Sequence, residues 1–276
     1  MARILILALA ISAVFCEEIT PEDNPTTLPS NDVQNVTEAD YSESNREKRI
    51  YNGQPVSIGR HPWMAALLLR NKKFNCGGSV ITPMLILTAQ HCISPNPPAF
   101  VRVNSNDWND GGELHQVNPG GVHAFPNDDN YWLHDIAVVA LRTRIRYPHM
   151  VTLGSPQYYP PAGAALQVAG WGLTPQGWPR LLHETSIYTM DMKSCYSYGY
   201  TLPQSKAFCT HTYHSSICRG DSGSAVMYKG VQIGVVSHLN KPNMDAQYTC
   251  FSRSPDTMAF VPAYLNWIRP YMRKYR

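Results

Sequence analysis

A histidine, an aspartate and a serine each lie in a short motif that suits covalent catalysis. His91 precedes Cys92, Asp135 begins an apolar run that ends at Leu141, and Ser222 lies in the segment Gly-Asp-Ser-Gly. A serine hydroxyl is a weak nucleophile, and it needs an adjacent base whose pKa is near the working pH, which an imidazole supplies. Taken singly, each motif also has a plain structural explanation: packing beside a cystine, a turn before a strand, and a loop.

Together, in the order His, Asp, Ser, the motifs resemble those of the chymotrypsin-like serine proteases. Further matches in the same order span residues 50–276. They are Ile50-Tyr51-Asn52-Gly53, Pro62-Trp63, Cys76-Gly77-Gly78-Ser79, Gly170-Trp171-Gly172 and Asn266-Trp267-Ile268. The resemblance implies a serine endopeptidase that works through an acyl-enzyme and uses no cofactor.

The resemblance also implies a role for each residue of the site. His91 would take the proton of Ser222 and later give it to the leaving amine, and Asp135 would orient the His91 ring. The backbone N–H groups of Gly220 and Ser222 would form the oxyanion hole, where one donor typically contributes about 3 kcal/mol to transition-state stabilisation.

Cysteine usage indicates an oxidising compartment. Cys16 lies at the end of an apolar N-terminal run, which leaves six cysteines in the rest of the chain. Six cysteines allow fifteen pairings. No two of them have the spacing of a zinc site, so we expect three disulfides. The resemblance implies the pairs Cys76–Cys92, Cys195–Cys209 and Cys218–Cys250.

We predict no metal site. Asp107, Asp110 and Glu113 could supply oxygens to calcium. Ser105, however, appears at the position of the family's first calcium ligand. Solvated surface charge is therefore the preferred interpretation of this loop.

The first 49 residues are predicted to be removed. Residues 1–16 have one basic residue and an apolar run too short for a bilayer, as in a secretory signal. Residues 17–49 hold nine acidic and three basic side chains, a net charge of −6, with little apolar periodicity. We expect a disordered propeptide there, with a glycosylation acceptor at Asn35.

The leader ends in Arg46-Glu47-Lys48-Arg49, directly before the apolar residue Ile50. This cluster resembles a furin-type convertase site, and a trypsin-like activating enzyme is the alternative. In the family, the cut frees an ammonium that enters the protein and pairs with the Asp before the nucleophile. Here these groups are Ile50 and Asp221, and a buried charge is tolerable only when it is paired. The chain is thus expected to be a zymogen, activated by cleavage after Arg49.

Residues 50–276 are predicted to form the protease domain. Short β-like runs alternate with Gly, Pro and Asn clusters, a pattern typical of an all-β sandwich or barrel. From the family we expect two antiparallel six-stranded β-barrels, at about 50–150 and 160–261. Helical spacing then predicts a C-terminal helix at about 262–270, which ends near Pro270.

The specificity pocket is interpreted residue by residue from the family pattern. Ser216 stands where trypsins carry Asp, so strict Arg or Lys specificity is disfavoured. Ile217 lines the wall, and Leu239 narrows the entrance where the family normally has glycine. If these two cover Asp256, the pocket prefers a small or medium aliphatic side chain, as in elastase. The alternatives are a large apolar pocket, or an open Asp256 that favours basic side chains.

The two residues directly before Leu239 can also be compared with the family pattern. Ser237 matches a serine that supports the catalytic Asp, and His238 replaces an aromatic residue of the family.

The predicted protein is therefore a secreted, monomeric endopeptidase with polypeptide substrates and no nucleic-acid or membrane partner. The alternative is a non-catalytic binding homologue. Residues 50–276 hold nineteen basic and eleven acidic side chains, a net charge of +8 that is compatible with polyanion binding. Such homologues usually lack a triad residue, whereas all three are present here.

Overall fold

The computed structural model describes residues 53–126, 134–197, 205–213, 215–239, 250 and 254–276. The signal segment, the propeptide, Asn35 and the cleavage site after Arg49 all lie outside the described residues. In the part that is described, no helix is long and apolar enough to cross a membrane.

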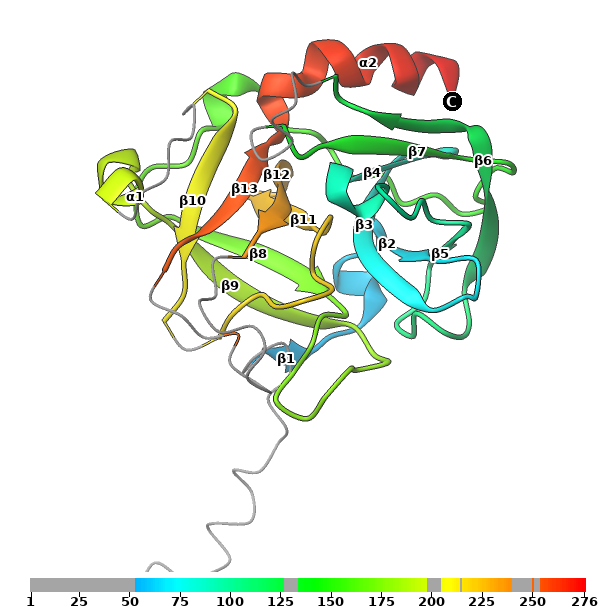
Figure 1. The fold of residues 1–276 in the computed structure, drawn as a ribbon, viewed down its shortest axis with the longest axis horizontal. Helices are drawn as coiled ribbons and strands as arrows, with labels where there is room; N and C mark the ends of the chain where they lie inside the picture. The colour runs from blue at the N-terminus through cyan, green and yellow to red at the C-terminus, as the bar shows by residue number, and fades with distance from the viewer. Residues whose placement is uncertain (1–52, 127–133, 198–204, 214, 240–249, 251–253) are drawn as a thin grey trace, which may run out of the picture. The chain divides into compact units, whose positions relative to one another are not determined.

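The first half of the described chain forms a closed antiparallel barrel in the strand order β2-β3-β4-β7-β6-β5 (Figure 1). Its strands are β2 (Met64–Leu68), β3 (Phe74–Thr82), β4 (Leu85–Thr88), β5 (Phe100–Val103), β6 (Glu113–Ala124) and β7 (Ala137–Leu141). The short 3₁₀ helices η1 (Ile58–Arg60) and η2 (Gln90–Cys92) precede β2 and follow β4.

The second half closes a six-stranded ring in the order β8-β9-β10-β13-β12-β11. Its strands are β8 (Ala165–Gly170), β9 (His183–Thr189), β10 (Ala207–His211), β11 (Ala225–Tyr228), β12 (Val231–His238) and β13 (Asp256–Phe260). The 3₁₀ helix η3 (Pro156–Tyr158) precedes the ring, and the helix α1 (Met192–Ser197) lies between β9 and β10. The expected all-β fold of two six-stranded barrels is confirmed.

Strand β2 shows why the barrels pack together. Residues that alternate along a strand face opposite sides. Ala65 and Leu67 belong to the core of the first barrel. Met64, Ala66 and Leu68 instead pack in a cluster that includes Trp171 and Leu182 of the other half. An uninterrupted apolar strand is the expected sequence for an element that is buried on both faces.

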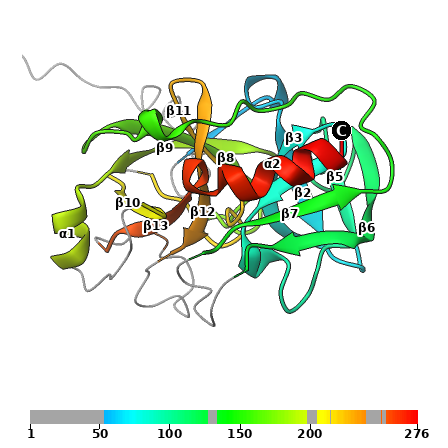
Figure 2. The same ribbon diagram turned by 90° about the horizontal axis from the view of Figure 1, so that it is seen from above.

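The elements differ from the approximate bounds expected from the sequence in two places. Residues Gln54–Pro55 form β1, which pairs with β9 of the second barrel rather than starting the first. The C-terminal helix α2 (Leu265–Lys274) follows η4 (Val261–Tyr264) and continues past Pro270. Ile268 and Tyr271 hold it against the first-barrel core, and this packing outweighs the hydrogen bond that proline removes. Figure 2 shows α2 lying across the molecule from the second barrel towards the first.

Candidate active site

The His91 ring and the Asp135 carboxylate are directly bonded. His91 lies on η2, and its neighbour Cys92 is tied to β3 by a disulfide with Cys76. Asp135 lies just before β7, which pairs with β4, the strand that leads into η2. The distance from His91 Nδ1 to Asp135 Oδ2 is 2.7 Å, and the His91 backbone N–H donates to Oδ1 at 2.9 Å. The carboxylate therefore orients both the ring and its backbone.

Asp135 is buried, and its hydrogen bonds favour the ionised carboxylate. It is 2 % exposed, and the Ser237 hydroxyl donates to its Oδ2 at 2.6 Å. Burial raises the pKa of Asp135, but the hydrogen bonds and charge of His91 and the Ser237 hydroxyl outweigh it and hold the pKa below its usual value. The His91 side chain, in contrast, is 35 % exposed and accessible from the surface.

The turn that carries Ser222 packs onto the same part of the first barrel. The Gly77 N–H donates to the Ser222 carbonyl at 2.8 Å, and the Gly223 N–H donates to Val236 O at 2.8 Å. Gly223 has a φ of +82°, and a Cβ there would meet Thr88 Oγ1 at 2.2 Å. Gly223 thus lets the turn approach the segment that leads to His91. The described residues contain no hydrogen bond from the Ser222 hydroxyl to His91, a contact that often tightens only when substrate binds.

Two backbone N–H groups beside Ser222 are available for an incoming oxygen. The Arg219 carbonyl accepts from Leu173 N at 2.7 Å, so the Gly220 N–H of the same trans peptide points the other way. Within the described residues, the N–H groups of Gly220 and Ser222 have no acceptor. Gly220 has a φ of +93°, and a Cβ there would lie 2.8 Å from a ring atom of Trp178. A side chain at 220 is therefore excluded by both conformation and space.

Asp221 lies directly beneath this turn and is fully buried. Its carboxylate accepts from Gly172 N at 2.9 Å and from Cys218 N at 2.8 Å. A Cβ at Gly170 or Gly172 would lie 2.2 or 2.4 Å from the Asp221 carboxyl group. This close approach explains the Gly-Trp-Gly motif. Burial raises the pKa of Asp221 to about 7, although the two N–H donors lower it.

The components of acyl transfer are a base held by a carboxylate, a serine nucleophile and two N–H donors. The structure has the base, two N–H groups without an acceptor, and a serine on a turn that packs against the segment leading to the base. The sequence model of the family described as Trypsin matches residues 50–268. The chain belongs to the trypsin family.

Individual relatives are distant. The chain is 29% identical to "Trypsin theta" of Drosophila melanogaster over 81% of its own length and 86% of the relative. It is 30% identical to "Trypsin alpha-4" of Lucilia cuprina over 80% of this chain and 86% of that one. Trypsin-family proteases act on polypeptides.

Solved structures share the fold at lower identity. A scabies mite inactivated protease paralogue has a TM-score of 0.70 at 22% identity, covering 80% of this chain and 96% of that one. Human heparin binding protein has a TM-score of 0.67 at 20% identity, over 80% and 96% of the two chains.

The structure contains the three disulfides that the resemblance implies. The candidate specificity-pocket residues of this trypsin-family chain are buried. Ser216, Ile217 and Asp256 are each at most 1 % exposed. Leu239 packs against the apolar cluster that contains Ile217.

The acidic loop of the first barrel has protein partners for each carboxylate. Asp107 pairs with Arg180 at 2.5 Å, and Asp110 accepts from Gly111 N at 2.8 Å. Glu113 accepts from Asn104 Nδ2 at 3.0 Å and from the N–H of Arg146 at 2.9 Å. The three carboxylates are therefore directed to different groups rather than to one centre.

Two features of the site were not anticipated. The first is His238, whose ring lies 5.7 Å from that of His91, centroid to centroid. The sequence signal was present, since His238 departs from the aromatic residue of the family pattern, but the sequence does not show which way its ring points. The second is Trp178 beside Gly220, on a loop without any motif.

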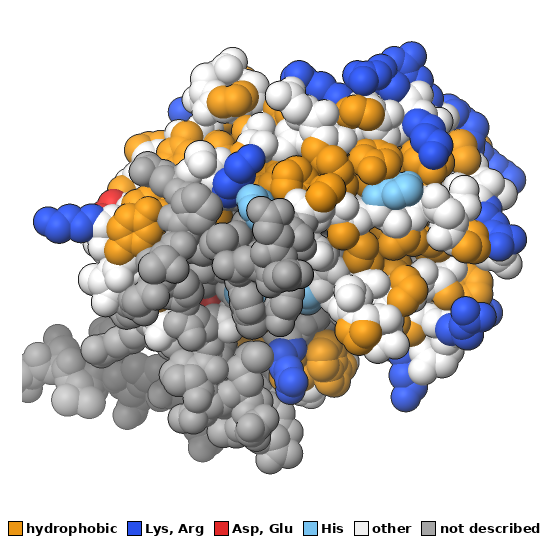
Figure 3. All heavy atoms as spheres, turned by 45° about the horizontal axis from the view of Figure 1, so that its top comes forward, with side chains coloured by type: hydrophobic (Ala, Val, Ile, Leu, Met, Phe, Trp, Pro, Cys, Tyr) orange, Lys and Arg blue, Asp and Glu red, His pale blue; other side chains and the backbone are white. Residues whose placement is uncertain are grey.

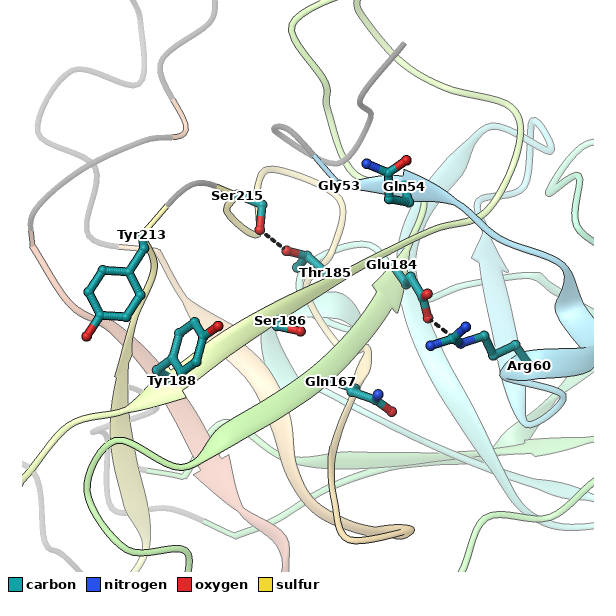
Figure 4. Close-up of a pocket in the computed structure, with 10 residues that line it drawn as sticks. All are labelled: Gly53, Gln54, Arg60, Gln167, Glu184, Thr185, Ser186, Tyr188, Tyr213 and Ser215. Atoms are coloured by element: carbon teal, nitrogen blue, oxygen red, sulfur yellow. Dashed lines mark hydrogen bonds and ion pairs between the residues drawn. The ribbon is translucent and has the colours of Figure 1, made fainter. Parts of the chain in front are cut away.

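A separate cavity of about 280 Å³ lies along β1 and β9 (Figure 4). Arg60 and Glu184 face each other across one side, with Arg60 Nε 3.0 Å from the Glu184 carboxylate. Tyr188 and Tyr213 lie at the other side. No candidate triad residue lines this cavity, so it is distinct from the site described above.

Proposed function

We propose that this chain is the precursor of a secreted serine endopeptidase whose triad is His91, Asp135 and Ser222. The observation that carries the proposal is the set of hydrogen bonds around Asp135, two from His91 and one from Ser237. They fix the tautomer with the proton on His91 Nδ1, which leaves Nε2 as a base.

In the proposed reaction, His91 Nε2 takes the Ser222 proton as Oγ attacks the substrate carbonyl. The N–H groups of Gly220 and Ser222 stabilise the oxyanion, and the imidazolium formed is stabilised by Asp135. His91 then protonates the leaving amine, and water hydrolyses the acyl-enzyme by the same steps in reverse order.

Activation is proposed to follow cleavage after Arg49. The new Ile50 ammonium would pair with Asp221, whose carboxylate holds only backbone N–H donors in the described residues. Because Asp221 is next to Ser222 and bonded to Cys218, its ionisation couples to the conformation of the oxyanion turn.

We further propose a preference for a small or medium aliphatic side chain before the scissile bond. The support is the burial of Asp256, at 1 % exposure, together with the packing of Leu239 on the cluster of Ile217. A covered carboxylate offers no counter-charge to a basic substrate side chain.

The test is to cleave the secreted precursor after Arg49 and confirm Ile50 as the N-terminus. The product is then offered a peptide library varied at the residue before the scissile bond. Cleavage that is lost in Ser222→Ala supports the triad, and an aliphatic preference supports the covered Asp256. Absence of cleavage in both samples would contradict the protease and favour a binding homologue.

A second candidate function is polyanion binding, alone or beside catalysis. Arg144, Arg269, Arg273 and Arg276 line a groove of about 750 Å³ beside α2. Figure 3 shows Lys and Arg side chains along the edge that α2 occupies in Figure 1. Clustered like charge of this kind attracts polyanions, and salt weakens the attraction.

Heparin retention tests this surface. We expect Arg269→Ala with Arg273→Ala to elute at clearly lower salt than the parent. Arg60→Ala with Arg180→Ala is the matched control, since it removes the same charge from arginines that are paired with Glu184 and Asp107. If the two double variants elute at the same salt concentration, heparin retention depends only on net charge and not on the surface beside α2.

A further inference from the structure

His238 adds a second imidazole to the triad. It is the last residue of β12, directly after Ser237. Its Nδ1 lies 2.7 Å from Ser237 Oγ and 4.0 Å from Asp135 Oδ2. The side chains of His91 and His238 are 35 % and 21 % exposed, whereas Asp135 is 2 % exposed. The cluster thus has a buried carboxylate at its base and two imidazoles nearer the solvent.

The three side chains match the ligand set of a zinc ion. Each can offer one ligand atom such that all three atoms lie within 4.8 Å of one another. Two imidazole nitrogens and a carboxylate oxygen are common zinc ligands, and bonds of about 2.0–2.2 Å place tetrahedral ligand atoms roughly 3.4 Å apart. His91 Nδ1 and Asp135 Oδ2 are now 2.7 Å apart, and His238 Nδ1 and Asp135 Oδ2 are 4.0 Å apart. Small rotations of the two rings therefore bring the ligand atoms to the required separation.

We propose that His91, Asp135 and His238 form an inhibitory site for Zn²⁺, with water as the fourth ligand. The inhibitory consequence, though not the binding, rests on the proposed protease function. Cys92 Sγ also lies 3.9 Å from His91 Nε2, but its sulfur is bonded to Cys76 and is not a thiolate ligand.

Binding of the metal removes the general base. When Zn²⁺ takes the Nδ1 lone pair of a neutral His91 ring, the single ring proton moves from Nδ1 through solvent to Nε2. That ring cannot accept the Ser222 proton. When Zn²⁺ takes Nε2 instead, the lone pair that would receive the proton is occupied. Both arrangements give reversible inhibition without contact with the substrate side chain.

His238 is the residue that separates this site from the triad itself. His91 and Asp135 serve catalysis in the proposed mechanism, so their substitution would not isolate metal binding. His238→Phe removes one ligand and keeps a flat ring of similar size. His211→Phe is the matched control, because His211 on β10 is a half-buried histidine outside the cluster.

The binding test uses protein that is cleaved after Arg49 and carries Ser222→Ala, so that it needs no activity. We expect one Zn²⁺ per chain by calorimetry and a Co²⁺ complex with the visible absorption of four-coordinate cobalt. His238→Phe should weaken Zn²⁺ binding by at least roughly 100-fold, because losing even a hydrogen-bonded partner of a metal ligand typically costs about 10–100-fold in affinity. His211→Phe should bind as the parent does. No binding by the parent, or equal binding by His238→Phe, would overturn the proposal.

The inhibition test uses the same proteins with Ser222 intact. Zn²⁺ should reduce peptide cleavage, EDTA should restore it, and His238→Phe should shift half-inhibition to roughly 100-fold higher Zn²⁺, each relative to its own metal-free rate. Zn²⁺ binding that depends on His238 in a chain without protease activity supports the metal site and refutes the protease. Protease activity that Zn²⁺ does not reduce overturns the inhibitory site alone.

Discussion

The candidate site contains two buried aspartates, Asp135 and Asp221, whose environments are opposite. Asp135 has two donors from His91 and one from Ser237, and its pKa lies below the usual value. Asp221 has two backbone N–H donors, and burial raises its pKa to about 7. Both are at most 2 % exposed, so burial alone does not decide whether a carboxylate is charged. The number and kind of its partners decide it.

The difference assigns the two carboxylates to different stages of the proposed function. The partners of Asp135 are all within the described chain, so its charge is already stabilised. Deprotonation of the buried Asp221 at neutral pH lowers the free energy of unfolding, and a cation that arrives next to the carboxylate removes this loss. The first carboxylate supports catalysis, and the second is suited to respond to cleavage.

The largest expected effect comes from neutralising Asp135. Asp135→Asn keeps the size of the side chain but can orient His91 with the wrong tautomer. We expect the kcat of the cleaved enzyme to fall roughly 10⁴-fold, while KM changes little. Steady-state kinetics on a cleaved peptide substrate measures both.

The control is Asp107→Asn, which neutralises a carboxylate paired with Arg180 in the loop of the first barrel. Its activity should stay close to that of the parent. A loss in Asp135→Asn no larger than in Asp107→Asn would remove Asp135 from the mechanism.

Asp221 should instead set the pH dependence of precursor stability. Its folded pKa of about 7 lies above the ordinary value for an unfolded carboxyl group, about 3.9. Below pH 4, Asp221 is protonated in both the folded and the unfolded state, so it does not lower the free energy of unfolding. As pH rises towards 7 the folded state must either hold the proton or bury a charge, so the free energy of unfolding falls by about 4 kcal/mol.

Urea unfolding of the uncleaved Ser222→Ala protein between pH 4 and 8 measures this loss. The same protein with Asp221→Asn is the reference, because other carboxylates such as Asp135 contribute equally to both. We expect the two stabilities to diverge as pH rises, with the Asn variant more stable at pH 8. After cleavage the order should reverse, since only the parent can pair with the Ile50 ammonium. Parallel curves before and after cleavage would contradict the coupling.

The sequence predicted the parts of the site that lie in short motifs. The apolar run that begins at Asp135 and ends at Leu141 predicted β7 with little error, because continuous burial leaves a strong local signal. β6 leaves a weaker signal in the sequence, since Pro119 and Gly121 interrupt its alternation and a register shift occurs between Val117 and Val122.

The contacts between distant segments could not be predicted in the same way. The sequence shows Gly170 and Gly172 as a pattern, but not that their missing side chains make room for the Asp221 carboxyl group. The position of His238 beside His91 similarly depends on how β12 of one barrel meets η2 of the other. Such contacts are set by packing, which no local spacing encodes.

The smallest expected effect concerns how tightly Gly172 packs against the Asp221 carboxyl group. A methyl group at residue 172 would lie 2.4 Å from the Asp221 carboxyl, whereas at Gly120 the nearest atom is 3.9 Å away. We expect Gly172→Ala to lower the free energy of unfolding by about 1–3 kcal/mol and Gly120→Ala to leave it nearly unchanged. Thermal unfolding of the uncleaved proteins measures both. In a double-mutant cycle, Gly172→Ala should cost much less when Asp221 is already alanine, because the clash is then gone. If the losses in free energy of unfolding from Gly172→Ala and Asp221→Ala are strictly additive, the methyl group disturbs something other than Asp221. The difference between the environments of Asp221 and Asp135 would then rest on their hydrogen bonds alone.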